Sequence, residues 1–141
     1  MTCSRWAICA SAMILAATAA PAYGSAFLQS SAFFQSPSGN IGCAISTAGV
    51  RCDIAEKSWS PSPKPASCPV DWGNGLTLSR RGKARYTCAG DTVLGQGRKL
   101  AYGKAISAGR FRCVSRKSGV RCTNRRNGHG FGLSRRRARR F

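Results

Sequence analysis

The chain has 141 residues, with 23 Lys and Arg against four Asp and Glu, which gives a formal net charge of +19. The length suits one domain, and a charge of this size bears on solubility and partners rather than on the fold. The chain has one histidine and no C-x₂₋₄-C pair, so the residue content argues against a structural zinc site, and we expect no metal and no cofactor.

Residues 1–22 have the pattern of a secretory signal peptide. Arg5 provides a positive start, an apolar or small run follows from Ala7 to Ala20, and Ala20-Pro21-Ala22 resembles a cleavage site. The run is too short to span a bilayer as a stable helix. We therefore expect cleavage after Ala22, or alternatively near Gly24, with no transmembrane anchor afterwards; an uncleaved anchor is the competing interpretation.

The mature chain begins with a flexible lead-in over residues 23–32, which are mostly small or polar. Phe33-Phe34-Gln35 predicts a short strand, and the turn formers of Ser36–Asn40 end it. From here a single domain is expected to extend over residues 33–134.

The segment from Cys43 to Cys52 predicts a β-hairpin. With a two-residue loop at Thr47-Ala48, alternation places three facing pairs on one side of the hairpin: Ile41 with Ile54, Cys43 with Cys52, and Ile45 with Val50. The cysteines then form a non-hydrogen-bonded pair, with Cα atoms about 4.5 Å apart, a spacing that a disulfide tolerates. Alternatively, Gly49 favours a type I turn with a G1 bulge, which would move the cysteines out of direct register.

A near copy of this segment extends from Cys113 to Cys122, and both copies end in Gly-Val-Arg-Cys. In the second hairpin the flanking pairs are Ser115 with Val120 and Phe111 with Asn124. Arg112 and Arg121 occupy its opposite side, and Arg51 is the analogous residue of the first hairpin. One side of each hairpin is therefore expected to be apolar, while the other carries positive charge.

The rest of the chain predicts short strands and turns. Four prolines between Glu56 and Gly75 exclude a long helix there. The expected strands cover Leu76–Leu78, Ala84–Cys88, Leu100–Tyr102, Lys104–Ile106 and Gly128–Leu133, with a basic turn at Arg80–Lys83. No amphipathic helix is evident, so we predict an all-β fold, a small sandwich or barrel of short antiparallel strands containing the two C-x8-C hairpins.

Six cysteines remain once the signal peptide is removed, which implies disulfides in an exported chain. Of the fifteen pairings that six cysteines allow, we favour nearest neighbours. These pairs are Cys43–Cys52, Cys68–Cys88 and Cys113–Cys122. The predicted domain is thus disulfide-stabilised.

The last seven residues, 135–141, form a basic tail with five arginines in its first six positions. These charges repel one another, and the run offers too little apolar surface to offset the entropy cost of ordering it. We therefore predict a disordered tail.

Several sequence motifs along the chain resemble those of a family of small secreted actinobacterial proteins classed only as a domain of unknown function. They are Phe34–Cys43, Gly49–Ile54, Asp71–Gly73, Cys88–Thr92, Leu100–Gly103 and Gly128–Phe131. The resemblance covers about residues 33–134. It implies export and a cysteine-stabilised domain, and it transfers no catalytic residue.

His129, between two glycines, is the most enzyme-like residue. A hydrolase acting on phosphodiesters could pair it with Glu56 or Asp91 as acid and base, but the sequence offers no spacing that brings them together. Trp59 and Trp72 could form a stacking platform for a sugar or peptide, or could instead pack over the proline-rich loop.

The favoured function is that of an exported, extracellular or envelope-associated, monomeric domain that acts by binding rather than catalysis. The expected partner is an anionic polymer of the cell envelope or an acidic protein, with nucleic acid bound only non-specifically. The expected binding residues are arginines of the hairpins and the tail: Arg51, Arg112, Arg121, Arg135, Arg136, Arg137, Arg139 and Arg140. The alternative is the small secreted hydrolase that uses His129.

Overall fold

The computed structural model describes residues 31–141, so the predicted signal peptide and all but the end of the lead-in lie outside the described residues. Eleven strands and no helix occur in this part of the chain. They form two sheets. Sheet A contains β1 (Ala32–Gln35), β2 (Ile41–Ile45), β3 (Gly49–Ile54), β4 (Trp72–Ser79), β5 (Arg85–Cys88) and β6 (Arg98–Lys99). Sheet B contains β7 (Ala105–Ala108), β8 (Phe111–Arg116), β9 (Gly119–Asn124), β10 (Gly130–Leu133) and β11 (Ala138–Arg140).

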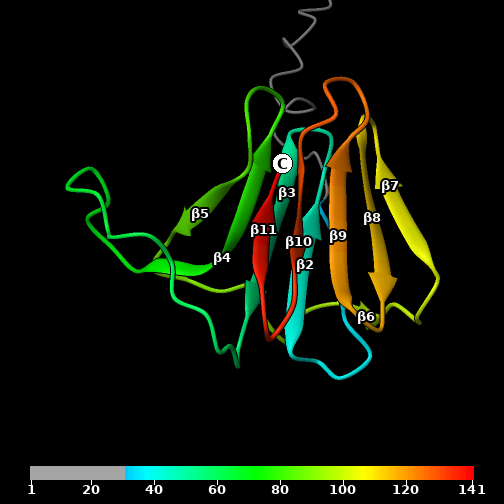
Figure 1. Cartoon of the computed structure of the whole chain (residues 1–141). Helices are drawn as coiled ribbons and strands as arrows, with labels where there is room; N and C mark the ends of the chain where they lie inside the picture. Colours follow the sequence, from blue (N-terminus) through cyan, green and yellow to red (C-terminus); the bar gives the residue numbers. More distant parts are fainter. Residues whose placement is uncertain (1–30) are drawn as a thin grey trace, which may run out of the picture.

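Each sheet is a meander in which consecutive strands lie side by side and antiparallel. The order is β5-β4-β3-β2-β1-β6 in sheet A and β11-β10-β9-β8-β7 in sheet B. The exception is β6, which lies in the connection between the meanders and pairs parallel to β1. Sheet B lies in front of sheet A in Figure 1. Buried apolar side chains from both sheets form one core. The predicted all-β, disulfide-stabilised fold is confirmed, in the form of a two-sheet sandwich rather than a barrel.

The two C-x8-C hairpins lie at equivalent places within the sheets, as β2–β3 and β8–β9. Cys43 faces Cys52 and Cys113 faces Cys122, with the flanking pairs in the predicted register. The first hairpin has the two-residue loop, since the N–H of Ser46 donates to the carbonyl of Gly49 at 2.9 Å. Gly49 lacks the positive φ that a G1 bulge requires, so the alternative turn does not form.

The disulfides of the two hairpins meet in the core. Both span a Cα–Cα distance of 4.1 Å, and all four cysteines are fully buried. The Sγ atoms of Cys52 and Cys122 are 4.0 Å apart, one from each sheet. The third disulfide, Cys68–Cys88, ties the proline-rich loop to β5. The structure thus contains the three nearest-neighbour pairs that the sequence favours.

Some strand boundaries differ from the predictions. The fourth strand begins at Trp72 rather than Leu76, because its extra residues continue the pairing with β3 and β5. The expected strand at Leu100–Tyr102 is absent; instead β6 precedes it, and Leu100 turns into the core.

The prediction of a disordered tail is wrong for residues 138–140, which form β11 on the edge of sheet B (Figure 1). β11 pairs with β10, and the backbones of Phe141 and Gly130 exchange two hydrogen bonds of 3.1 Å. Ala138 packs against the core. The charge repulsion expected in the tail is reduced because alternation sends Arg139 and Arg140 to opposite sides of the sheet.

No helix long and apolar enough to cross a membrane is found among the described residues.

Candidate functional site: the basic outer face of sheet B

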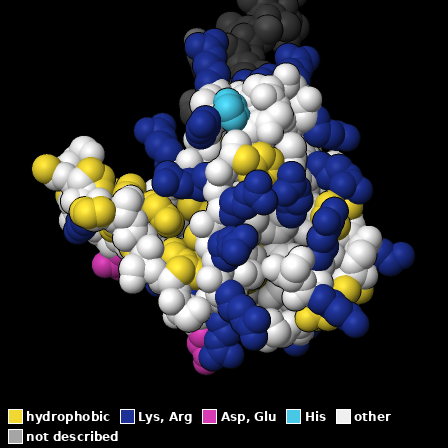
Figure 2. Space-filling model, viewed as in Figure 1, with side chains coloured by type: hydrophobic (Ala, Val, Ile, Leu, Met, Phe, Trp, Pro, Cys, Tyr) yellow, Lys and Arg dark blue, Asp and Glu magenta, His cyan; other side chains and the backbone are white. Residues whose placement is uncertain are grey.

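The outer face of sheet B carries a group of arginines that the alternation of its strands brings together. On β8, Phe111, Cys113 and Ser115 point into the core, so the residues between them point outward. The same alternation places Arg121 of β9 and Arg139 of β11 on this side. The resulting basic face consists of Arg112, Arg116, Arg121, Arg125 and Arg139, all exposed (Figure 2).

Cross-strand register sets the spacing on the basic face. Gly132 of β10 lies opposite both Arg121 and Arg139, so one strand separates these two guanidinium groups. A side chain added at Gly132 would meet no atom within 4 Å, which leaves open surface between the two arginines. The ring of Phe141 lies 4.2 Å from the Cζ of Arg121 and holds that guanidinium over the sheet.

Next to this open strip is a shallow depression of about 260 Å³, lined by Arg112, Arg116, Arg121, Arg125 and two shorter side chains, Val114 and Thr123. No Asp or Glu follows Asp91 in the sequence, so no strand of sheet B contains an acidic residue. The electrostatic potential over the face is therefore positive, and guanidinium groups suit planar, two-point recognition of phosphate or carboxylate.

Arg112, Arg121 and Arg139 of the predicted set therefore share one surface, while Arg116 and Arg125 were missed. Their signal was available in the sequence, because each lies four residues beyond Arg112 or Arg121 on the same side of the strand.

Arg51, by contrast, is not available for binding a polyanion, and that prediction is wrong. Its Nε and one terminal nitrogen donate to the two carboxylate oxygens of Asp53 at 3.1 and 2.8 Å. The other terminal nitrogen donates to Asp91 at 2.8 Å. Asp53 is 1% exposed and also accepts from Thr92 and the N–H of Val93. This Arg51–Asp53 clamp fixes the loop after β5 against sheet A.

Asp91 is the exposed end of the clamp. Hydrogen bonding from Arg51, together with its charge, holds the pKa of the Asp91 carboxyl below its ordinary value. The folded state thus favours the ionised carboxylate. The ionised Asp91 carboxylate therefore stabilises the folded state at pH values above its unfolded-state pKa. This stabilisation is lost as the pH falls through the lowered pKa of the folded state. Asp91 therefore has a structural partner of its own.

The remaining tail arginines do not form one surface. Arg135 pairs with Glu56, and the guanidinium of Arg140 lies 4.7 Å from the ring centre of Tyr86 on β5. Arg136 and Arg137 are exposed in the turn between β10 and β11. Only Arg139 of the tail joins the basic face.

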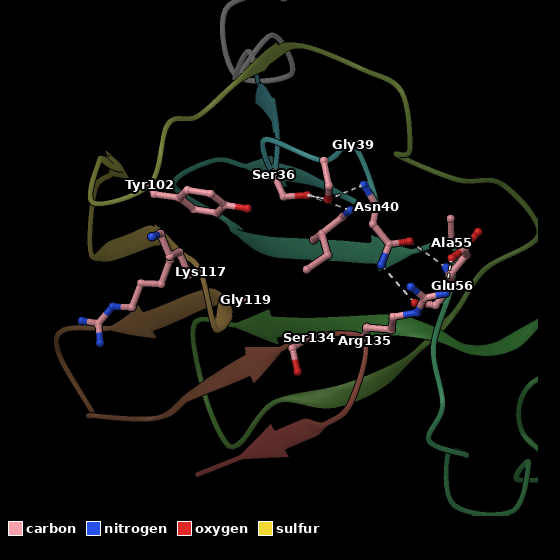
Figure 3. A pocket seen from close by; sticks show the side chains of 13 residues that line it. Ser36, Gly39, Asn40, Ala55, Glu56, Tyr102, Lys117, Gly119, Ser134 and Arg135 are labelled. Carbon is pink, nitrogen blue, oxygen red and sulfur yellow. Dashed lines mark hydrogen bonds and ion pairs between the residues drawn. The ribbon is translucent and has the colours of Figure 1, made fainter.

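A groove of about 520 Å³ lies at one end of the sandwich, beside the turn that joins β1 to β2 (Figure 3). Asn40 shapes the turn, since its side-chain amide donates to the carbonyl of Glu56 and accepts from its N–H. Tyr102, Lys117 and Arg116 line the other side. Because Arg116 also lines the depression on sheet B, the basic face continues into this groove.

The weak catalytic candidates are not brought together. The Nδ1 atom of His129 lies 3.3 Å from the carbonyl oxygen of Phe141, whereas Glu56 pairs with Arg135 and Asp91 with Arg51. In Figure 2 the histidine lies near the top of the view, away from the acidic side chains that are visible at the left and at the bottom. Over residues 31–141, no three His, Cys, Asp or Glu side chains gather in a way that could hold a metal ion.

Trp59 and Trp72 both pack against Tyr86, with ring centres 6.0 Å apart in each case. Trp59 donates its ring N–H to the carbonyl of Ser134, and Trp72 donates to that of Ser62. The two indoles therefore anchor the proline-rich loop to the side of the sandwich, which is the second of the roles considered from the sequence.

Comparison with known proteins adds a family and no function. No curated protein and no solved structure matches the chain. The model of a family of unknown function, DUF6636, matches residues 10–141, which include the basic face and β11. The match covers nearly the whole chain, and the protein therefore belongs to the DUF6636 family, whose function is unknown.

Proposed function

We propose that this protein is an exported, non-enzymatic domain that binds an anionic polymer or an acidic partner through the basic face of sheet B. The observation that carries the proposal is the gathering of five exposed arginines on a sheet whose strands contain no acidic residue. Repeated phosphate or carboxylate groups on a flexible chain suit such a surface, because several weak, screened contacts add together.

Three disulfides in a small domain support a location in an oxidising compartment outside the cytoplasm. Mass spectrometry of the protein collected outside the cells tests this part of the proposal. A mature chain that starts near Tyr23 or Ser25 supports it, and retention of Met1 to Ala20 contradicts it.

Binding is tested with a short DNA duplex, used only as a polyanion of known charge spacing. Wild-type protein should bind with an affinity that falls steeply with salt concentration. The face variant Arg112→Gln/Arg121→Gln should flatten the log–log salt dependence by about two units, at roughly one unit for each phosphate contact removed.

The matched control is Arg85→Gln/Arg98→Gln, which removes the same charge from exposed positions of sheet A. It should change the salt dependence by well under one unit. If the salt dependence flattened equally in the two variants, only net charge would matter, and the basic face would not be the binding site. Cleavage of the duplex that disappears in His129→Ala would instead support the hydrolase interpretation.

A further inference from the structure

Four turns from both sheets meet at the end of the sandwich opposite the groove of Figure 3. They are the turns β2–β3, β4–β5, β7–β8 and β9–β10 (Figure 1). The Nε of Arg80 donates to the carbonyl of Thr47 at 3.0 Å, and buried Asn124 donates to the carbonyl of Arg80 at 3.1 Å. The side chain of Arg125 donates to the carbonyl of Gly109 at 2.9 Å. These hydrogen bonds join the turns into a fixed unit.

The turns enclose a pocket of about 350 Å³, lined by three arginines, Arg80, Arg110 and Arg126, together with Thr47 and Gly109. We name this the three-arginine pocket. No acidic side chain lines it, and none of the ion pairs in the described part of the chain involves its arginines. The terminal nitrogens of Arg80, Arg110 and Arg126 also lack an acceptor among the described residues. The terminal nitrogens of the three guanidinium groups thus keep donor hydrogens that no described residue accepts.

The like charges around Arg110 act on its protonation. Partial desolvation and the charges of Arg126, Arg80 and Arg81 lower the pKa of the Arg110 guanidinium from its ordinary value. Bringing like charges together is unfavourable, and an anion placed between them removes that cost. The hydrogen bonds from the side chains of Arg80, Asn124 and Arg125 to backbone carbonyls hold the turns together in spite of the repulsion.

Thr47 also lines the pocket, but its hydroxyl does not open onto it. Its hydroxyl is buried and has no hydrogen-bond partner among residues 31–141. A buried hydroxyl without a partner is unfavourable, and such groups call for a physical explanation. Because the hydroxyl has almost no accessible surface, only the three guanidinium groups supply donors that a bound acceptor could meet.

We infer that the three-arginine pocket binds a phosphate group, as inorganic phosphate or as the terminal phosphate of a larger molecule. A tetrahedral oxyanion offers acceptors in several directions, which matches the forked donors of arginines on three turns. This site is separate from the basic face, because no residue lines both. The inference does not depend on the proposed function.

Isothermal titration of the oxidised, mature protein with inorganic phosphate, at constant ionic strength against chloride, tests the inference. One phosphate per chain should bind. Arg126→Gln should weaken binding at least about tenfold, as expected for the loss of a charged hydrogen bond. The side chain of Arg126 makes no hydrogen bond to the described residues, so this variant should fold normally. Thr47→Val, which removes only a buried hydroxyl, should change the phosphate affinity less than about threefold.

Arg81→Gln is the matched control, because Arg81 is close enough to affect Arg110 but does not line the pocket. It should change the phosphate affinity less than about threefold. The inference would be overturned if Arg81→Gln and Arg126→Gln lost phosphate affinity equally, or if Arg126→Gln bound phosphate as tightly as the wild-type protein. The absence of phosphate binding to the wild-type protein would also overturn it. The Arg112→Gln/Arg121→Gln variant should retain phosphate binding, which separates this site from the basic face.

Discussion

The Arg51–Asp53 clamp provides the sharpest test of the structure. The carboxylate of Asp53 accepts four hydrogen bonds, two from Arg51 and one each from Thr92 and the N–H of Val93. Asp53→Asn keeps the shape of the side chain but removes its charge and replaces one acceptor oxygen with a donor. At least one donor must then face an amide N–H instead of a carboxylate.

The expected cost follows from the burial of the two partners. Breaking a buried ion pair by removing one partner typically costs about 3–5 kcal/mol. The Arg51 side chain is 20% exposed and keeps Asp91, so the lower end of this range applies, about 3 kcal/mol. For a domain of this size, about 4 °C of Tm accompanies each kcal/mol, so the Tm should fall by about 12 °C.

Thermal unfolding of the oxidised protein, followed by calorimetry, measures this change. Asp71→Asn serves as the control, because Asp71 is exposed and its side chain forms no hydrogen bond within the described residues; its effect should stay within about 0.5 kcal/mol. Combining Asp53→Asn with Arg51→Gln should cost less than the sum of the single changes by at least about 1 kcal/mol. The reasoning fails if Asp53→Asn is no more destabilising than the control.

Two further predictions concern sheet B. Deleting residues 135–141 should lower the free energy of unfolding by at least about 2 kcal/mol, because the two hydrogen bonds between Gly130 and Phe141 contribute about 1 kcal/mol each. An unchanged denaturation midpoint would instead support the prediction that the tail is disordered. Ser115→Ala should raise the free energy of unfolding by about 1 kcal/mol, because the buried Ser115 hydroxyl has no partner among the described residues. Chemical denaturation measures this change, and a loss of stability would show that the hydroxyl is hydrogen-bonded.

Arg51 illustrates what the alternation of residues along a strand can predict and what it cannot. Period two correctly puts Arg51 on the side of the hairpin away from the disulfide, as it does for Arg112 and Arg121. The pattern cannot say what lies beyond that side. Over sheet A, the loop that carries Asp91, 40 residues along the chain, covers Arg51 and neutralises it. Over sheet B no acidic segment is present, and Arg112 and Arg121 remain exposed.

The C-terminal tail shows the same limit of prediction from sequence, because here a neighbouring strand orders a segment that was predicted to be disordered. Its composition predicts disorder, and that argument assumes a chain with no neighbour. The edge of β10 supplies the neighbour, with unpaired backbone groups and an apolar site for Ala138. The three-arginine pocket was equally hidden, because its arginines lie on three turns that are distant in sequence.

The sequence by itself determined the all-β class, the register of both hairpins and the nearest-neighbour disulfides. These features follow from contacts between residues about ten to twenty positions apart, and alternation and turn chemistry specify such contacts locally. Tertiary structure alone decided which arginines are neutralised, which stay exposed, and which converge on one pocket. Charge–charge energies depend on distance and on burial, and both are set only when the two meanders pack against each other.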